Sequence, residues 1–222
     1  VSGKGSYEFD VMISDRIVSY GYLSSAVIYP LYRYEEKFGK LGQAINIKES
    51  ALKKFSSCVG REVKPEEVFY YVFGFLTSPE YKQKYGHYIK VELPKVRLPE
   101  NEEEFVKTVE LGKALADILL NYENLNPKQV CELNEDERNE PLIDVKFKQN
   151  ELVLNGRIKI PLSLSDYKVG GKHPIRWICE YLKRTQDKET EIVWDPKLTI
   201  GQFVELVGKL LTLEEKVMEL IK

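Results

Sequence analysis

The spacing of hydrophobic residues predicts that most of the chain is helical. Within residues 102–122, apolar side chains recur every three or four positions and form one stripe, the pattern of a helix with one buried face. Proline, serine and threonine stand where further helices would begin, because they suit the N-cap or the first turn. The predicted helices cover residues 48–58 and 102–122 and begin near Pro65, Pro79, Pro174 and Thr199, with another start at Thr212.

The hydrophobic period changes to two between residues 143 and 160, which predicts strands. Ile143, Val145 and Phe147 alternate with charged residues, and Asn155-Gly156 is the strongest short signal for a hairpin. We expect an antiparallel meander of three short strands, buried on one face only. The other stretches are short β-type runs within residues 9–34 and loops at residues 35–47 and 123–141.

This order of elements predicts an α+β fold, with a helical body packed against a small antiparallel sheet. We expect one domain over residues 9–222. Its first part, residues 9–141, is mainly helical and begins with short strands, and its second part, residues 142–222, holds the meander and two C-terminal helical segments. Residues 1–8 are expected to be a linker or the boundary of an excised domain.

Composition favours a cytoplasmic protein without a metal or cofactor of its own. No apolar run approaches the length of a membrane span, and the start lacks the apolar core of a signal peptide. The three cysteines are few and widely spaced, which argues against a disulfide framework and favours a reducing compartment. With only two histidines, no zinc site of the usual ligand spacing can be assembled.

The motifs of common enzyme classes are absent from the sequence. Residues 169–172 lack the spacing of a phosphate-binding loop, and no strand is followed by a dinucleotide-binding glycine pattern or a serine nucleophile elbow. Asp144 and Lys146 have the acidic-x-Lys spacing of a metal-dependent nuclease, although ordinary strand alternation explains the pair more simply. A stand-alone nuclease that uses these two residues is the weakest of three alternatives.

The net charge of −2 conceals an asymmetry. Residues 100–140 contain twelve acidic and four basic residues, whereas residues 143–184 contain nine basic and four acidic ones. Such a division indicates either that one surface meets an anionic partner or that solvated charges have segregated by chance.

Alternation places several cations of the meander on its exposed face, and more cations surround the glycine pair at residues 170–171. Neighbouring like charges repel, so such a face serves solubility and edge protection or binds an anion. The candidate phosphate-binding residues are Lys146, Lys148, Arg157, Lys159, Lys168, Lys172 and Arg176. Gln149 and Asn155, in the turns, are the candidate base-reading residues.

Several segments, taken in order, resemble the C-terminal specificity domain of type ISP restriction–modification enzymes. The matching segments are AVIYPLYRY at 26–34 with the family's FPLYLY strand, NIKE at 46–49 with NLNPE, residues 65–72 and 78–85 with PEDVFYYIYAILHSPEYRERY, LPKVRLP at 93–99 with FPRIPLP, ELGKALAD at 110–117 with ELGRKLADLHL, and residues 167–177 with YVVGGRSALEW.

The resemblance implies a target-recognition domain for double-stranded DNA and no catalysis within these residues. In that family one polypeptide also carries a nuclease, a helicase-like ATPase and an adenine-N6 methyltransferase, so S-adenosylmethionine, ATP and magnesium would bind elsewhere in the parent enzyme. Because the glycine pair is a family motif, the resemblance favours a structural turn at residues 170–171. The alternative is a module that docks onto the methyltransferase and helicase domains of the same enzyme without reading bases.

Overall fold

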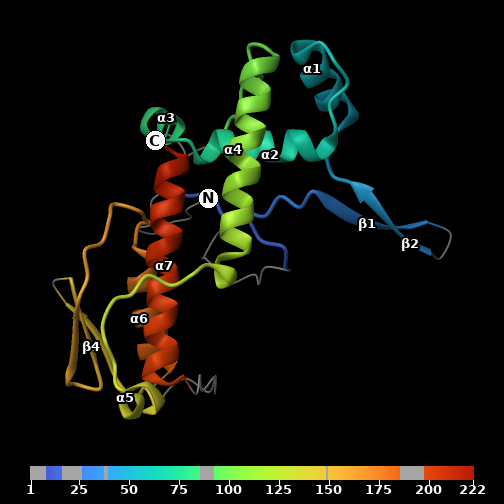
Figure 1. Cartoon of the computed structure of the whole chain (residues 1–222). Helices are drawn as coiled ribbons and strands as arrows, with labels where there is room; N and C mark the ends of the chain where they lie inside the picture. Colours follow the sequence, from blue (N-terminus) through green and yellow to red (C-terminus); the bar gives the residue numbers. More distant parts are fainter. Residues whose placement is uncertain (1–8, 17–26, 38–39, 86–92, 149, 186–197) are drawn as a thin grey trace. The chain divides into compact units, whose positions relative to one another are not determined.

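The computed structural model describes residues 9–16, 27–37, 40–85, 93–148, 150–185 and 198–222. Helices predominate, and two small antiparallel sheets complete an α+β fold, as predicted (Figure 1). The chain divides into two compact units, residues 1–120 with 220–222 and residues 121–219. The division therefore falls about twenty residues before the boundary between helical part and meander that we expected at residue 141. Residues 1–8, expected to be a linker, lie outside the described residues.

The first unit begins with a two-stranded ribbon and continues with four helices. Pro65 and Pro79 occupy the first helical positions, and Ser78 caps the second of these helices by accepting the Tyr81 amide at 3.2 Å. The elements are β1 (Tyr32–Lys37), β2 (Lys40–Ile45), α1 (Glu49–Val59), α2 (Pro65–Thr77), α3 (Pro79–Tyr85) and α4 (Glu102–Leu120).

Helices α2 and α4 cross with their backbones in contact, because each has a glycine at the crossing point (Figure 1). A Cβ added to Gly112 would lie 2.9 Å from the Tyr70 carbonyl carbon, and one added to Gly74 would lie 2.9 Å from the Gly112 nitrogen. Both distances are too short for real side chains. Only glycine at both positions allows the two backbones to approach this closely.

Aromatic rings fill the space beside this crossing. Tyr71 and Phe105 are fully buried, with ring centroids 5.5 Å apart, and Phe55 meets Tyr71 edge-on at 5.2 Å. The Tyr71 hydroxyl donates to the Arg97 carbonyl at 3.2 Å, and burial raises its pKa to about 12. This tyrosine therefore belongs to the core.

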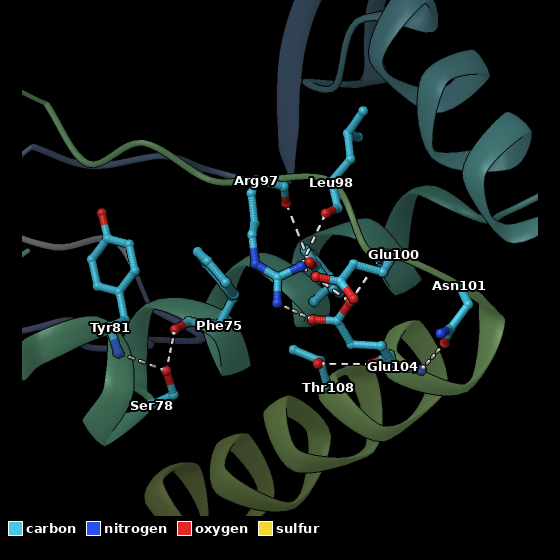
Figure 2. A network of polar contacts seen from close by, with 10 residues as sticks. Phe75, Ser78, Tyr81, Arg97, Leu98, Glu100, Asn101, Glu104 and Thr108 are labelled. Atoms are coloured by element: carbon cyan, nitrogen blue, oxygen red, sulfur yellow. Dashed lines mark hydrogen bonds and ion pairs between the residues drawn. The ribbon is translucent and has the colours of Figure 1, made fainter. Parts of the chain in front are cut away.

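An ion pair secures the entry to α4. The Arg97 guanidinium bonds the Glu104 carboxylate and lies 5.5 Å from the ring centroid of Phe75 (Figure 2). Glu104 also accepts the Glu100 amide at 2.7 Å, while Asn101 caps the helix by accepting the Glu104 amide at 2.9 Å. The hydrogen bond from Arg97 outweighs partial burial, so the pKa of the Glu104 carboxyl lies below its usual value.

The second unit contains the predicted meander and the last two helices of the chain, α6 and α7. Its elements are η1 (Tyr122–Asn124), α5 (Glu135–Asn139), β3 (Val145–Lys148), β4 (Glu151–Leu154), β5 (Ile158–Pro161), α6 (Pro174–Thr185) and α7 (Ile200–Leu220). The strand order is β3-β4-β5, all antiparallel. One face of this sheet is buried, and α6 packs on its β3 edge.

Three local expectations were wrong. Residues 35–47, expected to be loop, contain most of the β1–β2 ribbon, and the acidic loop holds the short helix α5. Thr212 does not start a new helix, since α7 runs through it and its hydroxyl donates to the Asn126 and Gly208 carbonyls at 2.9 and 3.2 Å. Within the described ranges, no helix combines the length and apolarity that crossing a membrane requires.

Candidate nucleic-acid interface

The outer face of the meander carries three of the seven predicted cations. Lys146 on β3 and Lys159 on β5 both pair with Val153 on the central strand β4. The two lysines therefore lie on the same face of the sheet, on either side of Val153. Lys148 lies two positions after Lys146 and shares that face. All three lysines are exposed. Lys146 bonds Asp144 at 2.8 Å, whereas Lys148 and Lys159 make no ion pair with any described residue.

Arg157 does not join this face as an unpaired cation. The register pairs Leu154 with Ile158, which leaves Arg157 in the three-residue turn and outside the alternation of β5. Its guanidinium bonds the carboxylates of Glu137 and Glu140, both from the acidic segment. The sequence predicted that Arg157 would share the exposed face with Lys146, Lys148 and Lys159, but the turn brings Arg157 to acidic residues that neutralise it.

Asn155, a candidate base-reading residue, has its side-chain amide fully engaged. Its oxygen accepts the amides of Ile143 and Asp144 at 2.8 and 3.1 Å, and its nitrogen donates to Glu140 and to the Pro141 carbonyl at 2.8 and 2.9 Å. An amide side chain can make four such bonds, so none is left for a base. These four hydrogen bonds give the Asn155 side chain a structural role, and base reading by Asn155 stays a prediction. The other candidate, Gln149, lies outside the described residues.

The glycine pair forms a tight turn. Gly170 and Gly171 have φ angles of 57° and 87°, a region that side chains disfavour, and Val169 and Lys172 exchange two backbone hydrogen bonds at 2.8 and 3.3 Å. Trp177 donates its indole N–H to the Val169 carbonyl at 2.6 Å. The structural reading of this motif is therefore confirmed.

The cations around the glycine turn do not extend the lysine face of the sheet. Arg176 lies 4.7 Å from the ring centroid of Phe147, whose side chain alternates with Lys146 and Lys148 and so points to the opposite face. Lys172 bonds Glu180 at 2.6 Å and lies 4.8 Å from the ring centroid of Trp177. Lys168 is exposed in the preceding loop. The sequence grouped these cations with those of the meander, but α6 places Arg176 on the other side of the sheet.

Sequence reasoning missed the buried pair of His173 and Glu214. His173 Nε2 lies 2.6 Å from a Glu214 carboxylate oxygen, and its Nδ1 accepts the Ile175 amide at 3.2 Å. Because Nδ1 accepts a hydrogen bond, the ring proton is on Nε2, and the Nε2–H group donates a hydrogen bond to Glu214. Burial opposes ionisation of Glu214, yet the hydrogen bonds from His173 and Ser165 outweigh it, and the pKa of this carboxyl lies below its usual value. The only sequence signal was an acidic residue on the apolar stripe of α7.

A metal centre does not emerge among the residues that the structure describes. No three histidine, cysteine, aspartate or glutamate side chains in these ranges are grouped as metal ligands. Asp144, the residue on which the nuclease alternative rests, is instead bonded by Lys146.

Comparison with known protein families shows to which family the chain belongs. Residues 1–205 match the type ISP C-terminal specificity domain. The chain belongs to this family. The match covers every element described above except the greater part of α7, which continues to Leu220. No curated protein matches the chain.

Three solved structures share the fold of this specificity domain. The chain of the DrdV–DNA complex aligns with a TM-score of 0.74 at 20% identity, over 99% of our chain and 23% of its own length. The type ISP enzyme LlaBIII bound to DNA aligns with a TM-score of 0.60 at 23% identity, over 86% of our chain and 13% of its own length. A nuclease-deletion mutant of LlaGI with a DNA substrate mimic aligns with a TM-score of 0.59 at 25% identity, over 86% of our chain and 17% of its own length. Our chain therefore spans less than a quarter of the length of each of these chains.

Proposed function

We propose that this specificity domain recognises a sequence in double-stranded DNA and positions the duplex for other domains of a longer polypeptide. The observation that carries the proposal is the family match over residues 1–205, together with a fold shared with chains whose structures contain DNA. Recognition requires no chemistry of its own. An adenine methyltransferase and an ATP-dependent nuclease would belong to the other domains, which would bind S-adenosylmethionine, ATP and magnesium.

Within the second unit, the exposed lysine face of the meander is the surface best suited to the phosphate backbone. Lys148 and Lys159 are exposed and make no ion pair with described residues, so both can bind a phosphate, although Glu151 lies opposite Lys148 on the same face. Lys146 would have to exchange its contact with Asp144 for a phosphate. Lys168 is a further candidate, whereas Arg157, Lys172 and Arg176 are already engaged by acidic or aromatic side chains.

A titration of duplex DNA at several salt concentrations tests the proposal. Each phosphate contact releases counterions, so the slope of log K against log salt is negative, and its magnitude should fall by about 0.9 for each lysine that is removed. We expect Lys148→Glu and Lys159→Glu to weaken binding to every sequence and to reduce this slope. Lys216→Glu, an exposed lysine on α7 without a described ion pair, is the matched control and should change neither.

A second candidate, an intramolecular docking module, is favoured by an apolar groove between α6 and α7. The groove has a volume of about 630 Å³ and is lined by residues that include Ile178, Tyr181 and Leu206. Its occupant would be the methyltransferase domain, given that the solved relatives are at least four times longer than our chain. Binding of the isolated chain to that domain, without salt-dependent binding to DNA, would favour docking over recognition.

A further inference from the structure

We infer that the β1–β2 ribbon of the first unit is a second DNA-contacting element, which reads an A·T base pair from the major groove through Gln43. The inference rests on the proposed function and extends it to a region that the sequence analysis assigned to a loop. It is carried by the register of the ribbon, the exposure of its side chains and the charge of the residues around it.

The register gathers on one face of the ribbon the Gln43 amide, two tyrosines, two apolar side chains and one carboxylate, that of Glu36. Gln43 pairs directly with Tyr34, and Leu41 and Ile45 lie two positions away on the same face. Tyr34 and Leu41 are 68% and 73% exposed, and Gln43 is exposed as well. This face therefore places the Gln43 amide among apolar and aromatic groups, with Glu36 opposite Leu41 near the turn and Tyr32 opposite Ile45 at the base.

The base of the ribbon is anchored, and one of its anchors, Tyr32, lies at the base of this same face. The Asn46 amide donates to the Leu31 carbonyl at 2.8 Å, and its side chain donates to the Pro30 carbonyl at 2.9 Å. The Tyr32 hydroxyl donates to Glu66 of α2 at 2.9 Å. An isolated two-stranded hairpin is only marginally stable, so these bonds hold the ribbon in place and leave its face available for a ligand.

Charge selects an anionic occupant. Residues 31–64 contain eight basic and four acidic residues, a second basic stretch in a chain whose net charge is −2. Lys48 follows the ribbon and Lys54 lies on α1; both are exposed and make no ion pair with described residues. Lys53, beside them, is engaged by Glu49 at 2.7 Å. A purely apolar protein partner would have no use for these unpaired lysines, whereas phosphates flanking a groove would.

The dimensions and chemistry of the face match the major groove. This groove admits a two-stranded ribbon, and a glutamine side chain forms a bidentate pair with N6 and N7 of adenine. Apolar side chains such as Leu41 contact the thymine methyl group at the same level. The Tyr34–Gln43 face would therefore lie on the base edges, with Lys48 and Lys54 on neighbouring phosphates.

Selection of bound sequences from a random duplex library by the 222-residue chain tests this inference. Gln43→Ala should lower the preference for one A·T pair by about 5- to 150-fold and leave the preferences at other positions unchanged. Gln43→Arg should move the preference at that same position to guanine, which a merely structural glutamine would not do. Gln83→Ala, an exposed glutamine on α3, is the matched control and should select the wild-type sequence. Circular dichroism of each variant checks that the fold is intact.

The outcomes separate this inference from the proposed function. Failure of the wild-type chain to select any sequence would remove both. Selection by the wild type, with an unchanged sequence preference in both Gln43 variants, would overturn the ribbon and leave recognition to other surfaces. If Tyr34→Ala abolished self-association or binding to another domain while DNA selection persisted, the face would be a protein contact and the inference would be wrong.

Discussion

His173 donates a hydrogen bond from Nε2 to the Glu214 carboxylate at 2.6 Å, and both side chains are about 95% buried. The contact joins the start of α6, directly after the glycine turn, to the middle of α7. Glu214 also accepts the Ser165 amide at 2.6 Å. A single carboxylate thus ties two helices and the loop after β5 together within the second unit.

His173→Ala should destabilise the chain by about 2–3 kcal/mol, because it leaves a buried carboxylate without its side-chain donor. The free energy of unfolding in urea measures the loss. Glu219→Gln, an exposed glutamate on the same helix, should change it by less than about 0.5 kcal/mol. Equal effects of the two substitutions would mean that the buried pair adds nothing to stability.

Glu104 should make stability depend on pH in the acidic range. Its pKa is depressed in the folded state, first by the hydrogen bond from Arg97. A group with a depressed folded pKa stabilises the protein above its unfolded pKa, near 4.5. That contribution is lost as the pH falls through the folded value. The urea midpoints of wild type and Glu104→Gln should therefore differ at pH 7, and the difference should shrink as the pH falls below about 4.5. A constant difference across this range would contradict the assignment.

Gly112→Ala should prevent native packing of α2 on α4, at a cost of about 3 kcal/mol or more, since the new Cβ overlaps backbone atoms of Tyr70 that cannot move aside. Gly42→Ala is the control, because its Cβ would meet nothing closer than 3.7 Å. Thermal unfolding monitored by circular dichroism distinguishes the two. A Gly112→Ala variant that melts at the wild-type temperature would show that the helices do not cross this closely.

Asn155 should prove structural by the contrast between two substitutions. Asn155→Gly keeps the backbone φ of 47° accessible but removes the four side-chain hydrogen bonds, whereas Asn155→Ala loses the bonds and also strains the turn. We expect losses of about 2–4 kcal/mol for glycine and more for alanine. Neither variant, where folded, should change the DNA sequence selected; a change confined to one base pair would restore Asn155 as a reader of bases.

Arg157→Ala should weaken DNA binding less than Lys148→Glu, and it should leave the salt slope nearly unchanged, because Glu137 and Glu140 already neutralise the guanidinium. The comparison requires only the titration described above. If Arg157→Ala reduced the magnitude of the salt slope by about 0.9, the value for one phosphate contact, the arginine must leave these glutamates to bind a phosphate.

The extent to which this fold was predictable differs from element to element. Residues 102–122 and the meander were recognisable because their apolar side chains repeat with one clear period. The β1–β2 ribbon was not, since glycine and lysine interrupt its alternation and one of its anchoring bonds comes from Glu66, which is distant in the sequence. Arg157 was placed by counting back along β5, which fails where a three-residue turn breaks the alternation.

The sequence alone determined most of the helices, the meander and the family, because periodicity, capping residues and ordered motifs are local properties of the chain. Only the tertiary structure decided which cations face solvent unpaired, since the acidic partners of Arg157 and Lys172 and the aromatic ring beneath Arg176 are selected by packing. It also decided that Asn155 and His173 serve the fold. Charge and hydrogen-bonding capacity are written in the residues, but whether a ligand can use them depends on which neighbours the fold has already brought into contact.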